Sequence, residues 1–318
     1  MKVLVSVVLG LSILTGQAYA QDKFPEKPVT LIVPYAPGGT TDLLGRQLAA
    51  ELAEIWGQPV VVENRSGAGS MIGTAYLAQS NPDGYTLLVN TPAHVTAPAV
   101  YDDLPFDPAT DVTSVAMLSY SPFLMVAGSS VKADTLEGLI DEAKTGEMFI
   151  ATSGLGSSSH FAGELFASES GQSIDIVHFN GGGEALSSLM GGHAELYISS
   201  AASSMAAVSG GQVKPIAVLG AERYAKLPDT QATAEVGIET PDIRIWLGLF
   251  GPGGMPEPLV QKIASDIEQV LKSEGFLSML DSNYTMPANV SSAEFSSLVA
   301  TEMEFWKELA QRRGIQRE

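Results

Sequence analysis

Three loops of this 318-residue chain consist of the residue types that bind anions through the backbone. The first reads PYAPGGTTD at 34–42, the second TSGLGSSSH at 152–160, and the third NGGG at 180–183. Each loop lies between a predicted strand and a predicted helix. Glycine lets the backbone approach a ligand closely, and the first turn of a helix presents unpaired N–H groups with a partial positive charge. The pattern therefore predicts a site for a small anion.

A carboxylate is the anion that these loops suit. It accepts about four hydrogen bonds, so two such loops can satisfy one without an arginine. Each bond to a charged group contributes ~1.5–3 kcal/mol, and a helix N-terminus adds ~0.3–1 kcal/mol. In open α/β sheets such loops meet at the carboxyl ends of the strands, where ligands bind. One loop alone is more often an ordinary turn; three loops on one plan favour a binding site.

Other chemistries fit these residues less well. Ile72 stands where a dinucleotide fingerprint starting at Gly67 needs its third glycine, and neither a P-loop nor a G-x-S-x-G elbow occurs. The histidines lack metal-ligand spacing and have no cysteine to join them. We therefore predict no metal, no cofactor and no catalytic set. His160 is either a pocket residue or a hydrogen-bond partner of its loop, and Trp246 is either core or a wall of the cleft.

The elements that position these loops alternate between short β-rich runs and amphipathic helical patterns, which indicates α/β units with parallel strands. Thr41 and Asp42 are predicted to cap a helix that ends at Gly57 and has an apolar stripe. The stripe consists of Leu44, Leu48, Leu52 and Ile55. Strands are predicted at 29–33, 59–62, 85–89, 149–151, 174–177, 195–198, 215–219 and 243–250. Further helices are predicted at 71–78, 161–168, 184–190, 203–209, 256–273 and 292–312.

The first twenty residues have the pattern of a secretory signal peptide. Lys2 supplies the positive charge, residues 3–15 are uncharged and mostly apolar, and Ala18 and Ala20 are the small residues that a signal peptidase reads. The apolar run is too short to span a bilayer. Cleavage after Ala20 and export are therefore predicted, and the absence of cysteine leaves neither a lipid anchor nor a disulfide.

The charge balance excludes some partners. With 36 acidic and 17 basic residues the formal net charge is −19, which disfavours nucleic acid and anionic lipid surfaces. Net charge is screened over ~10 Å in ordinary salt, whereas hydrogen-bond donors act at contact. The acidic surface is therefore predicted to serve solubility and not to select the ligand.

Several ordered motifs resemble the Bug (TctC-like) family, the binding components of tripartite tricarboxylate transporters. The motifs are FPEKP at 24–28, VPYAPGGTTD at 33–42, QPVVVENRSGAG at 58–69, PDGYTLL at 82–88, SSHFAGELF at 158–166 and LPD at 227–229. They extend over essentially the whole chain after residue 20. The resemblance implies a periplasmic protein with two α/β lobes joined by crossing strands, the Venus flytrap fold. Lobe 1 is predicted to contain 21–121 and 242–318, and lobe 2 to contain 122–241.

The resemblance also implies that the loops at 35–41 and 153–158 hold one carboxylate of a small organic acid, partly through ordered waters. The chain departs from the family at 197–200, which reads YISS where many relatives carry an acidic residue, and at 178–183, which reads HFNGGG. Losing the acid removes a partner for an ammonium group, so a di- or tricarboxylate is favoured over an amino acid. The predicted ligand residues are Tyr35, Ala36, Gly38, Gly39, Thr40, Thr41, Asp42, Thr91, Ser153, Gly156, Ser157, Ser158, His160, Asn180, Gly181, Ser199 and Ser200.

The leading function is therefore capture of an organic acid for uptake through one small and one large integral membrane subunit. A binding module that feeds a membrane sensor kinase is the alternative, and a secreted enzyme is a third reading without a visible catalytic set. We expect a monomer that closes on its ligand.

Overall fold

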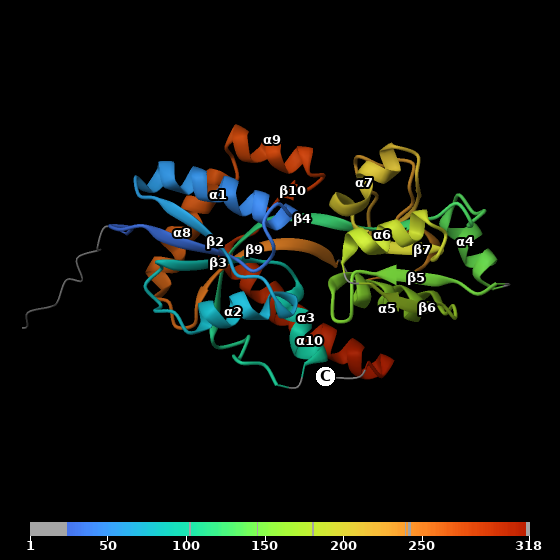
Figure 1. Ribbon diagram of the computed structural model, residues 1–318, viewed down its shortest axis with the longest axis horizontal. Coiled ribbons are helices and arrows are strands. Elements are labelled where there is room, and N and C mark those ends of the chain that lie inside the picture. The colour runs from blue at the N-terminus through green and yellow to red at the C-terminus, as the bar shows by residue number, and fades with distance from the viewer. Residues whose placement is uncertain are drawn as a thin grey trace, which may run out of the picture.

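The computed structural model describes residues 24–315 except 102, 145, 180, 239, 241 and 242. The predicted signal peptide lies outside the described residues. The described chain forms two α/β lobes side by side (Figure 1), which confirms the predicted fold class. No helix in this part of the chain has the length and apolar character needed to cross a membrane.

Lobe 1 is built on a sheet whose first three strands are parallel. They are β1 (Val29–Val33), β2 (Val60–Asn64) and β3 (Thr86–Asn90), with β1 between the other two. β9 (Arg244–Pro252) pairs antiparallel with β3 and with the first part of β4 (Val112–Ala127), whose other edge carries β10 (Met286–Pro287). The carboxyl ends of β1 and β3 lead into the predicted ligand residues 34–42 and 91.

Two strands join the lobes. β4 pairs with β9 as far as Pro122, and from Phe123 to Ala127 it pairs with β7 (Leu196–Ser200) on one edge and β8 (Lys214–Leu219) on the other. β9 enters lobe 1 from the side of lobe 2, so both strands cross between the lobes (Figure 1). The domain boundaries at 121/122 and 241/242 stay predictions, and residues 241 and 242 lie outside the described residues.

Lobe 2 continues from β7 into a parallel sheet with β5 (Phe149–Thr152) and β6 (Asp175–His178). Helices α6 (Gly182–Met190) and α7 (Ala201–Ser209) lie on one side of this sheet and α5 (Ser158–Ser170) lies on the other (Figure 1). α4 (Leu136–Ala143) lies at the outer end of the lobe (Figure 1).

The lobe 1 sheet is covered on both faces (Figure 1). One face carries α1 (Thr40–Trp56), α8 (Glu257–Val270) and α9 (Glu274–Ser282), and the other carries α2 (Met71–Ala78), α3 (Ala93–Val100) and α10 (Ser292–Arg313). Trp246 is 1% exposed and its indole N–H donates to Glu302 Oε2 at 3.0 Å, so it belongs to the core. Between the lobes, Phe161 of α5 packs against Trp306 of α10, with ring centroids 5.3 Å apart.

Most predicted elements are present, with ends shifted by a few residues. Helix α1 ends as predicted at Gly57, where φ is 62°, but the predicted cap is wrong. The helix begins at Thr40 with Gly39 as its N-cap, and no side chain supplies the capping bond. Ile55 of the predicted apolar stripe is 38% exposed. The pattern analysis missed β4, α3, α4 and α9.

Candidate functional site

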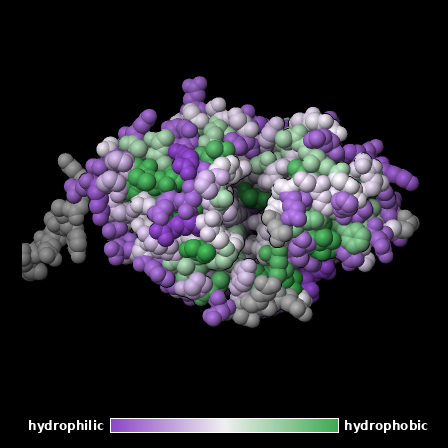
Figure 2. All heavy atoms as spheres, viewed as in Figure 1, coloured by the Kyte–Doolittle hydropathy of each residue, from purple (hydrophilic) through white to green (hydrophobic). Residues whose placement is uncertain are grey.

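A cavity of about 550 Å³ lies between the lobes. A space-filling view shows the hollow at the middle of the molecule (Figure 2). Both lobes contribute to its walls, and Ile245 comes from the crossing strand β9. The lining residues are Tyr35, Gly39, Thr40, Thr41, Gly69, Thr91, Ala93, Ala97, Tyr101, Ser153, Leu155, Gly156, Ser157, Ser158, Ser159, Gly182, Tyr197, Ser199, Ser200, Ser203 and Ile245.

Five helices of the described chain begin at this cavity. Helices α1 and α3 enter it from lobe 1, and α5, α6 and α7 enter it from lobe 2. Helix N-termini carry a partial positive charge and present N–H donors, so they favour an anion between them. Among the described residues that line the cavity, none is an Asp, Glu, Lys, Arg or His. The donors that these residues offer are therefore backbone N–H groups and hydroxyls.

The helix N-termini differ in how their N–H groups are satisfied. Ser157 caps α5 by accepting from His160 N, and Ser200 caps α7 by accepting from Ser203 N. The N-cap residues of α1 and α6 are Gly39 and Gly181, and neither helix has a side-chain capping bond. An oxygen of a ligand can supply the bond that a capping side chain would otherwise make. The two helices without a side-chain cap thus reach the same cavity from different lobes.

Side chains outside the cavity hold the first loop. Asp42 is 2% exposed, and its carboxylate accepts from Gly38 N at 2.9 Å and from Arg46 Nε at 3.0 Å. Asn64 Nδ2 also donates to it at 2.8 Å and to the Tyr35 carbonyl oxygen at 3.0 Å. The hydrogen bond from Arg46 is the main reason that the pKa of Asp42 falls to about 2. Asp42 therefore fixes the loop and does not line the cavity.

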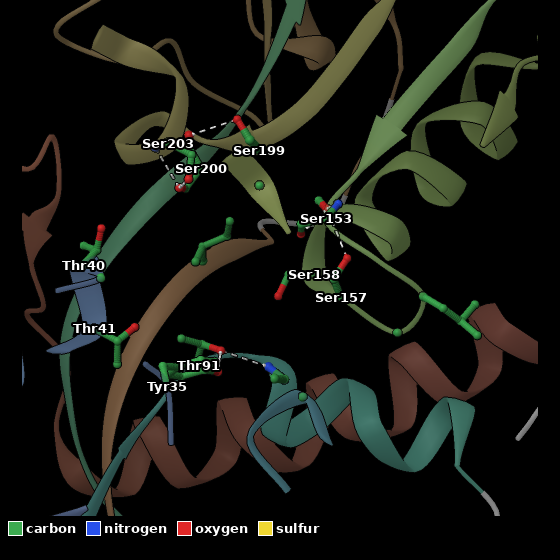
Figure 3. Close-up of a pocket in the computed structure, with 18 of the residues that line it drawn as sticks. Tyr35, Thr40, Thr41, Thr91, Ser153, Ser157, Ser158, Ser199, Ser200 and Ser203 are labelled. Carbon is green, nitrogen blue, oxygen red and sulfur yellow. Dashed lines mark hydrogen bonds between the residues drawn. The ribbon is translucent and has the colours of Figure 1, made fainter. Parts of the chain in front are cut away.

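Tyr35 anchors the floor of the site on the lobe 1 side. Its hydroxyl lies 2.6 Å from Thr91 Oγ1 (Figure 3) and donates to Asn90 Oδ1 at 3.1 Å. Burial raises the pKa of the Tyr35 phenol. The phenol stays neutral at physiological pH and can orient Thr91 toward a ligand.

The second loop is held by a network of serines. Ser159 Oγ accepts from Ser153 N at 2.7 Å and lies 2.8 Å from Ser153 Oγ, while Ser157 Oγ donates to the Gly154 carbonyl at 2.6 Å. Ser158 is different, because none of the described residues bonds its hydroxyl. The hydroxyls of Ser158 and Thr41 point into the space between the lobes (Figure 3). These two hydroxyls are free to bond a ligand.

At the far end of the cavity, serines take the place of charged groups. Ser200 Oγ lies 2.9 Å from Ser203 Oγ (Figure 3), and Ser199 Oγ lies 2.5 Å from the Oγ of Ser204, a residue outside the lining. Tyr197 is 1% exposed and burial raises its pKa to about 12, so it too is neutral. Gly182 is required beside it, because a Cβ there would lie 2.8 Å from the Tyr197 hydroxyl oxygen. This end offers neutral hydrogen-bonding groups in a small space.

The structure brings most of the predicted ligand residues around this one cavity. Those that line it are Tyr35, Gly39, Thr40, Thr41, Thr91, Ser153, Gly156, Ser157, Ser158, Ser199 and Ser200. Those that do not are Ala36, Gly38, Asp42, His160 and Gly181. The remaining predicted ligand residue, Asn180, lies outside the described residues. That the lining residues bind a ligand stays a prediction.

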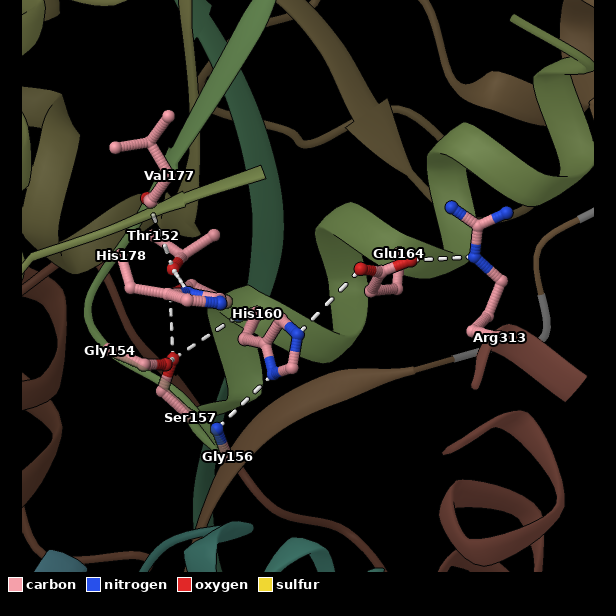
Figure 4. A network of polar contacts seen from close by, with 10 residues as sticks. Thr152, Gly154, Gly156, Ser157, His160, Glu164, Val177, His178 and Arg313 are labelled. Carbon is pink, nitrogen blue, oxygen red and sulfur yellow. Dashed lines mark hydrogen bonds and ion pairs between the residues drawn. The ribbon is translucent and has the colours of Figure 1, made fainter. Parts of the chain in front are cut away.

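His160 does not wall the cavity. It is 2% exposed, and its Nδ1 accepts from Gly156 N at 3.1 Å, so the Gly156 amide points at the ring and away from a ligand (Figure 4). Of the two readings from the sequence, the hydrogen-bond partner is therefore the one that the geometry favours.

Several residues that line the cavity are not among the predicted ligand residues. Ala93, Ala97 and Tyr101 belong to α3 or follow it, an element that the pattern analysis did not find. Gly69, Leu155, Ser159, Gly182, Tyr197, Ser203 and Ile245 complete the set. Gly182 was within reach of prediction, since it lies in the glycine run at 180–183. In the described part of the chain, no group of three or more His, Asp or Glu is placed to hold a metal ion.

Two α/β lobes, crossing strands and a polar cavity between them define a periplasmic binding protein. The sequence profile described as "Tripartite tricarboxylate transporter family receptor" matches residues 44–315. The chain belongs to this family of solute-binding receptors, as its motifs indicated.

Relatives extend over almost the full length. Protein BugT of Bordetella pertussis is 30% identical over 314 residues, covering 96% of both chains. Among solved structures, R. palustris Rpa4515 with adipate has a TM-score of 0.81 at 31% identity, covering 93% of this chain and 100% of that one. MatC from Rhodopseudomonas palustris with bound malate has a TM-score of 0.78 at 29% identity, covering 90% and 100%.

Proposed function

We propose that this protein captures a small dicarboxylate in the periplasm and delivers it to a tripartite transporter with one small and one large integral membrane subunit. The observation that carries the proposal is the chemistry of the cavity. Five helix N-termini and many hydroxyls meet there, and none of the described lining residues is an Asp, Glu, Lys, Arg or His. Such a site stabilises negative charge with backbone donors and offers no partner of opposite sign to a cation.

The binding mode follows from the capping pattern. One carboxylate lies between the N-termini of α1 and α5, where the Thr40, Thr41 and Ser158 hydroxyls add donors. The other polar end of the ligand faces α6 and α7, near Gly182 and Ser203. A carboxylate with its four acceptor sites filled gains ~1.5–3 kcal/mol for each bond, which the local geometry supplies without a salt bridge.

A dicarboxylate agrees with this lining better than an amino acid. A buried ammonium group needs a carboxylate or several acceptor oxygens. Asp42 and Glu164, which lie in or next to the first two loops, are already paired with Arg46 and Arg313 and do not line the cavity. The adipate and malate bound to the two Rhodopseudomonas proteins are both dicarboxylates, which supports the same class here.

We also propose that the chain is processed after Ala20, that it works as a monomer without catalysis, and that its lobes close around the ligand. Closure rests on the two crossing strands, which connect the lobes without a long linker. Size-exclusion chromatography with light scattering gives the mass, and small-angle scattering with and without ligand measures compaction.

The experiment that tests the ligand class is a thermal-shift screen of the processed protein. The set contains malonate, succinate, malate, adipate and citrate, with glycine, glutamate and glucose as comparison compounds. A ligand at 100 times its Kd stabilises the fold by about 2.7 kcal/mol, which raises the Tm by several degrees. Calorimetry then gives the affinity. A response to glucose or glycine, with none to any dicarboxylate, would overturn the proposal.

A further inference from the structure

A chain of contacts connects lobe 1 to the second ligand loop from outside the cavity and reaches the cavity lining only at Gly156 (Figure 4). It starts at Arg313, in the last turn of α10, whose Nε donates to Glu164 Oε2 at 2.6 Å. It continues from Glu164 Oε1 to His160 Nε2 at 3.8 Å, and from His160 Nδ1 to the Gly156 amide at 3.1 Å. Gly156 lines the cavity, whereas the other three residues do not.

The Gly156 contact sets the tautomer of His160. Because Nδ1 accepts a hydrogen bond from an N–H group, the proton of the neutral ring must be on Nε2. Glu164 faces that same nitrogen. A separation of 3.8 Å is too long for a hydrogen bond, but a carboxylate at this distance in a buried site still attracts the N–H proton. Both neighbours of the ring thus favour one tautomer.

Arg313 holds the Glu164 carboxylate in place beside His160 and favours its ionised form. The Glu164 side chain is 14% exposed and that of Arg313 is 34% exposed. Burial acts to raise the pKa of Glu164, but contacts with His160 and Arg313 outweigh it and the pKa is lowered. The other titratable group against His160 is His178 of β6, whose ring lies edge-on at 4.5 Å. Burial and His160 lower the pKa of His178, so it brings no competing charge at neutral pH.

The loop needs such support at Gly156. The residue has φ of +72°, and a Cβ there would lie 2.8 Å from Val100 Cγ2 of α3. Ser157 and Ser158 follow at once and begin α5, so an error in the Gly156 amide direction moves the helix N-terminus that faces the ligand. A displacement of about 1 Å is enough to weaken directed hydrogen bonds substantially.

We propose that Arg313 is a positioning residue for the ligand loop, acting from the other lobe through Glu164 and the Nε2–H tautomer of His160. The link to affinity rests on the proposed function, since it assumes that the loop at 153–158 contacts the ligand. The proposed effect of Arg313 on the geometry of the loop does not depend on that function. Because α10 belongs to lobe 1 and α5 to lobe 2, the arrangement of the lobes and the shape of the loop are coupled.

The test uses ¹⁵N-labelled processed protein without ligand, as wild type, Arg313→Gln and Arg313→Lys. Arg312→Gln is the matched control, because within the described residues Arg312 pairs with no carboxylate. The ¹⁵N shifts of the His160 ring report the tautomer, and hydrogen exchange reports the Gly156 amide. We expect protonated Nε2 in wild type. In Arg313→Gln we expect a mixture of tautomers and Gly156 exchange at least ten-fold faster. Arg313→Lys should restore most of both, and Arg312→Gln should match wild type.

Two further amides separate positioning from loss of structure. Leu88 in β3 reports global opening and Leu165 in α5 reports loosening of the helix, and neither should change in Arg313→Gln. Equal acceleration of Leu165 and Gly156, or an unchanged Gly156 amide with an unchanged His160 tautomer, would overturn the proposal. The same variants are then titrated with malate and adipate, and Kd should rise several-fold only in Arg313→Gln. If neither acid binds wild type, the proposed function fails. The exchange data and the His160 shifts still decide whether Arg313 positions the loop.

Discussion

The sharpest test of the site is Gly39→Val. The folded protein has room for the valine side chain, but this side chain would occupy space in the cavity that the ligand needs. Gly39 has φ of −76° and ψ of 166°, an extended conformation that valine adopts readily. A Cβ at this position meets only the Ala36 carbonyl oxygen, at 3.8 Å. Gly39 nevertheless lines the cavity as the N-cap of α1. The fold should therefore tolerate the substitution.

The expected loss of affinity follows from the bonds at stake. If valine displaces the carboxylate from the N-terminus of α1, about two bonds of ~1.5–3 kcal/mol each are lost. That sum, roughly 3–6 kcal/mol, corresponds to an increase in Kd of about 100-fold or more. Valine is a poorer N-cap residue than glycine, so the free energy of unfolding should fall by about 1 kcal/mol at most.

The assay is isothermal titration with the dicarboxylate that gives the largest thermal shift, together with urea unfolding of the free protein. Gly146→Val is the control. It stands on the surface between α4 and β5, outside the cavity lining, and a Cβ there meets no atom within 4 Å. Its Kd should stay within about three-fold of wild type. A folded Gly39→Val protein that binds like wild type would refute the placement of a carboxylate at α1.

Four other substitutions probe single contributions. Thr40→Ala and Ser158→Ala each remove one hydroxyl and should raise Kd about five-fold, equivalent to ~1 kcal/mol; calorimetry showing no change in either would exclude these donors. Burial lowers the pKa of His94 to about 4, so its neutral form is favoured on folding. The unfolded chain therefore takes up the proton first as pH falls, and wild type should lose about 3 kcal/mol more stability than His94→Gln between pH 7 and 4. Urea unfolding with His193→Gln as the exposed control measures this, and equal pH dependence of all three proteins would disprove it. Trp306→Ala should cost ~3–5 kcal/mol in the same assay, because it empties a buried contact between the lobes; a cost below 1 kcal/mol would contradict that role.

Local signals in the sequence were enough for the parallel αβ units and the loops between them. Val29–Val33 and Met71–Ala78 coincide with their predicted ranges, because apolar periodicity and turn residues act over a few positions. The family was likewise evident from ordered motifs, and the profile match confirmed it. Eleven of the predicted ligand residues line one cavity, since glycine- and hydroxyl-rich loops mark the ends of strands.

Local signals failed where an element depends on partners far away. The serines and the proline at 119–122 hid β4, whose sixteen residues form a strand because two sheets supply edges for it. Asp42 has the residue type of a helix cap, but its carboxylate accepts hydrogen bonds from Arg46 and Asn64. Asn64 lies on strand β2, more than twenty residues further along the chain. Helix α3 contains Pro98 and escaped detection, although it forms one wall of the cavity.

The roles within the site also came from tertiary structure. The sequence alone determined that small, glycine- and hydroxyl-rich loops precede several helices, because loop composition is a property of a few neighbouring residues. Only the crossing of β4 and β9 decided which N-termini face each other across one cavity. Likewise, only the contact of α10 with α5 decided that Arg313 pairs with Glu164 beside His160. These pairings join residues more than a hundred positions apart, and packing of the two lobes selects them.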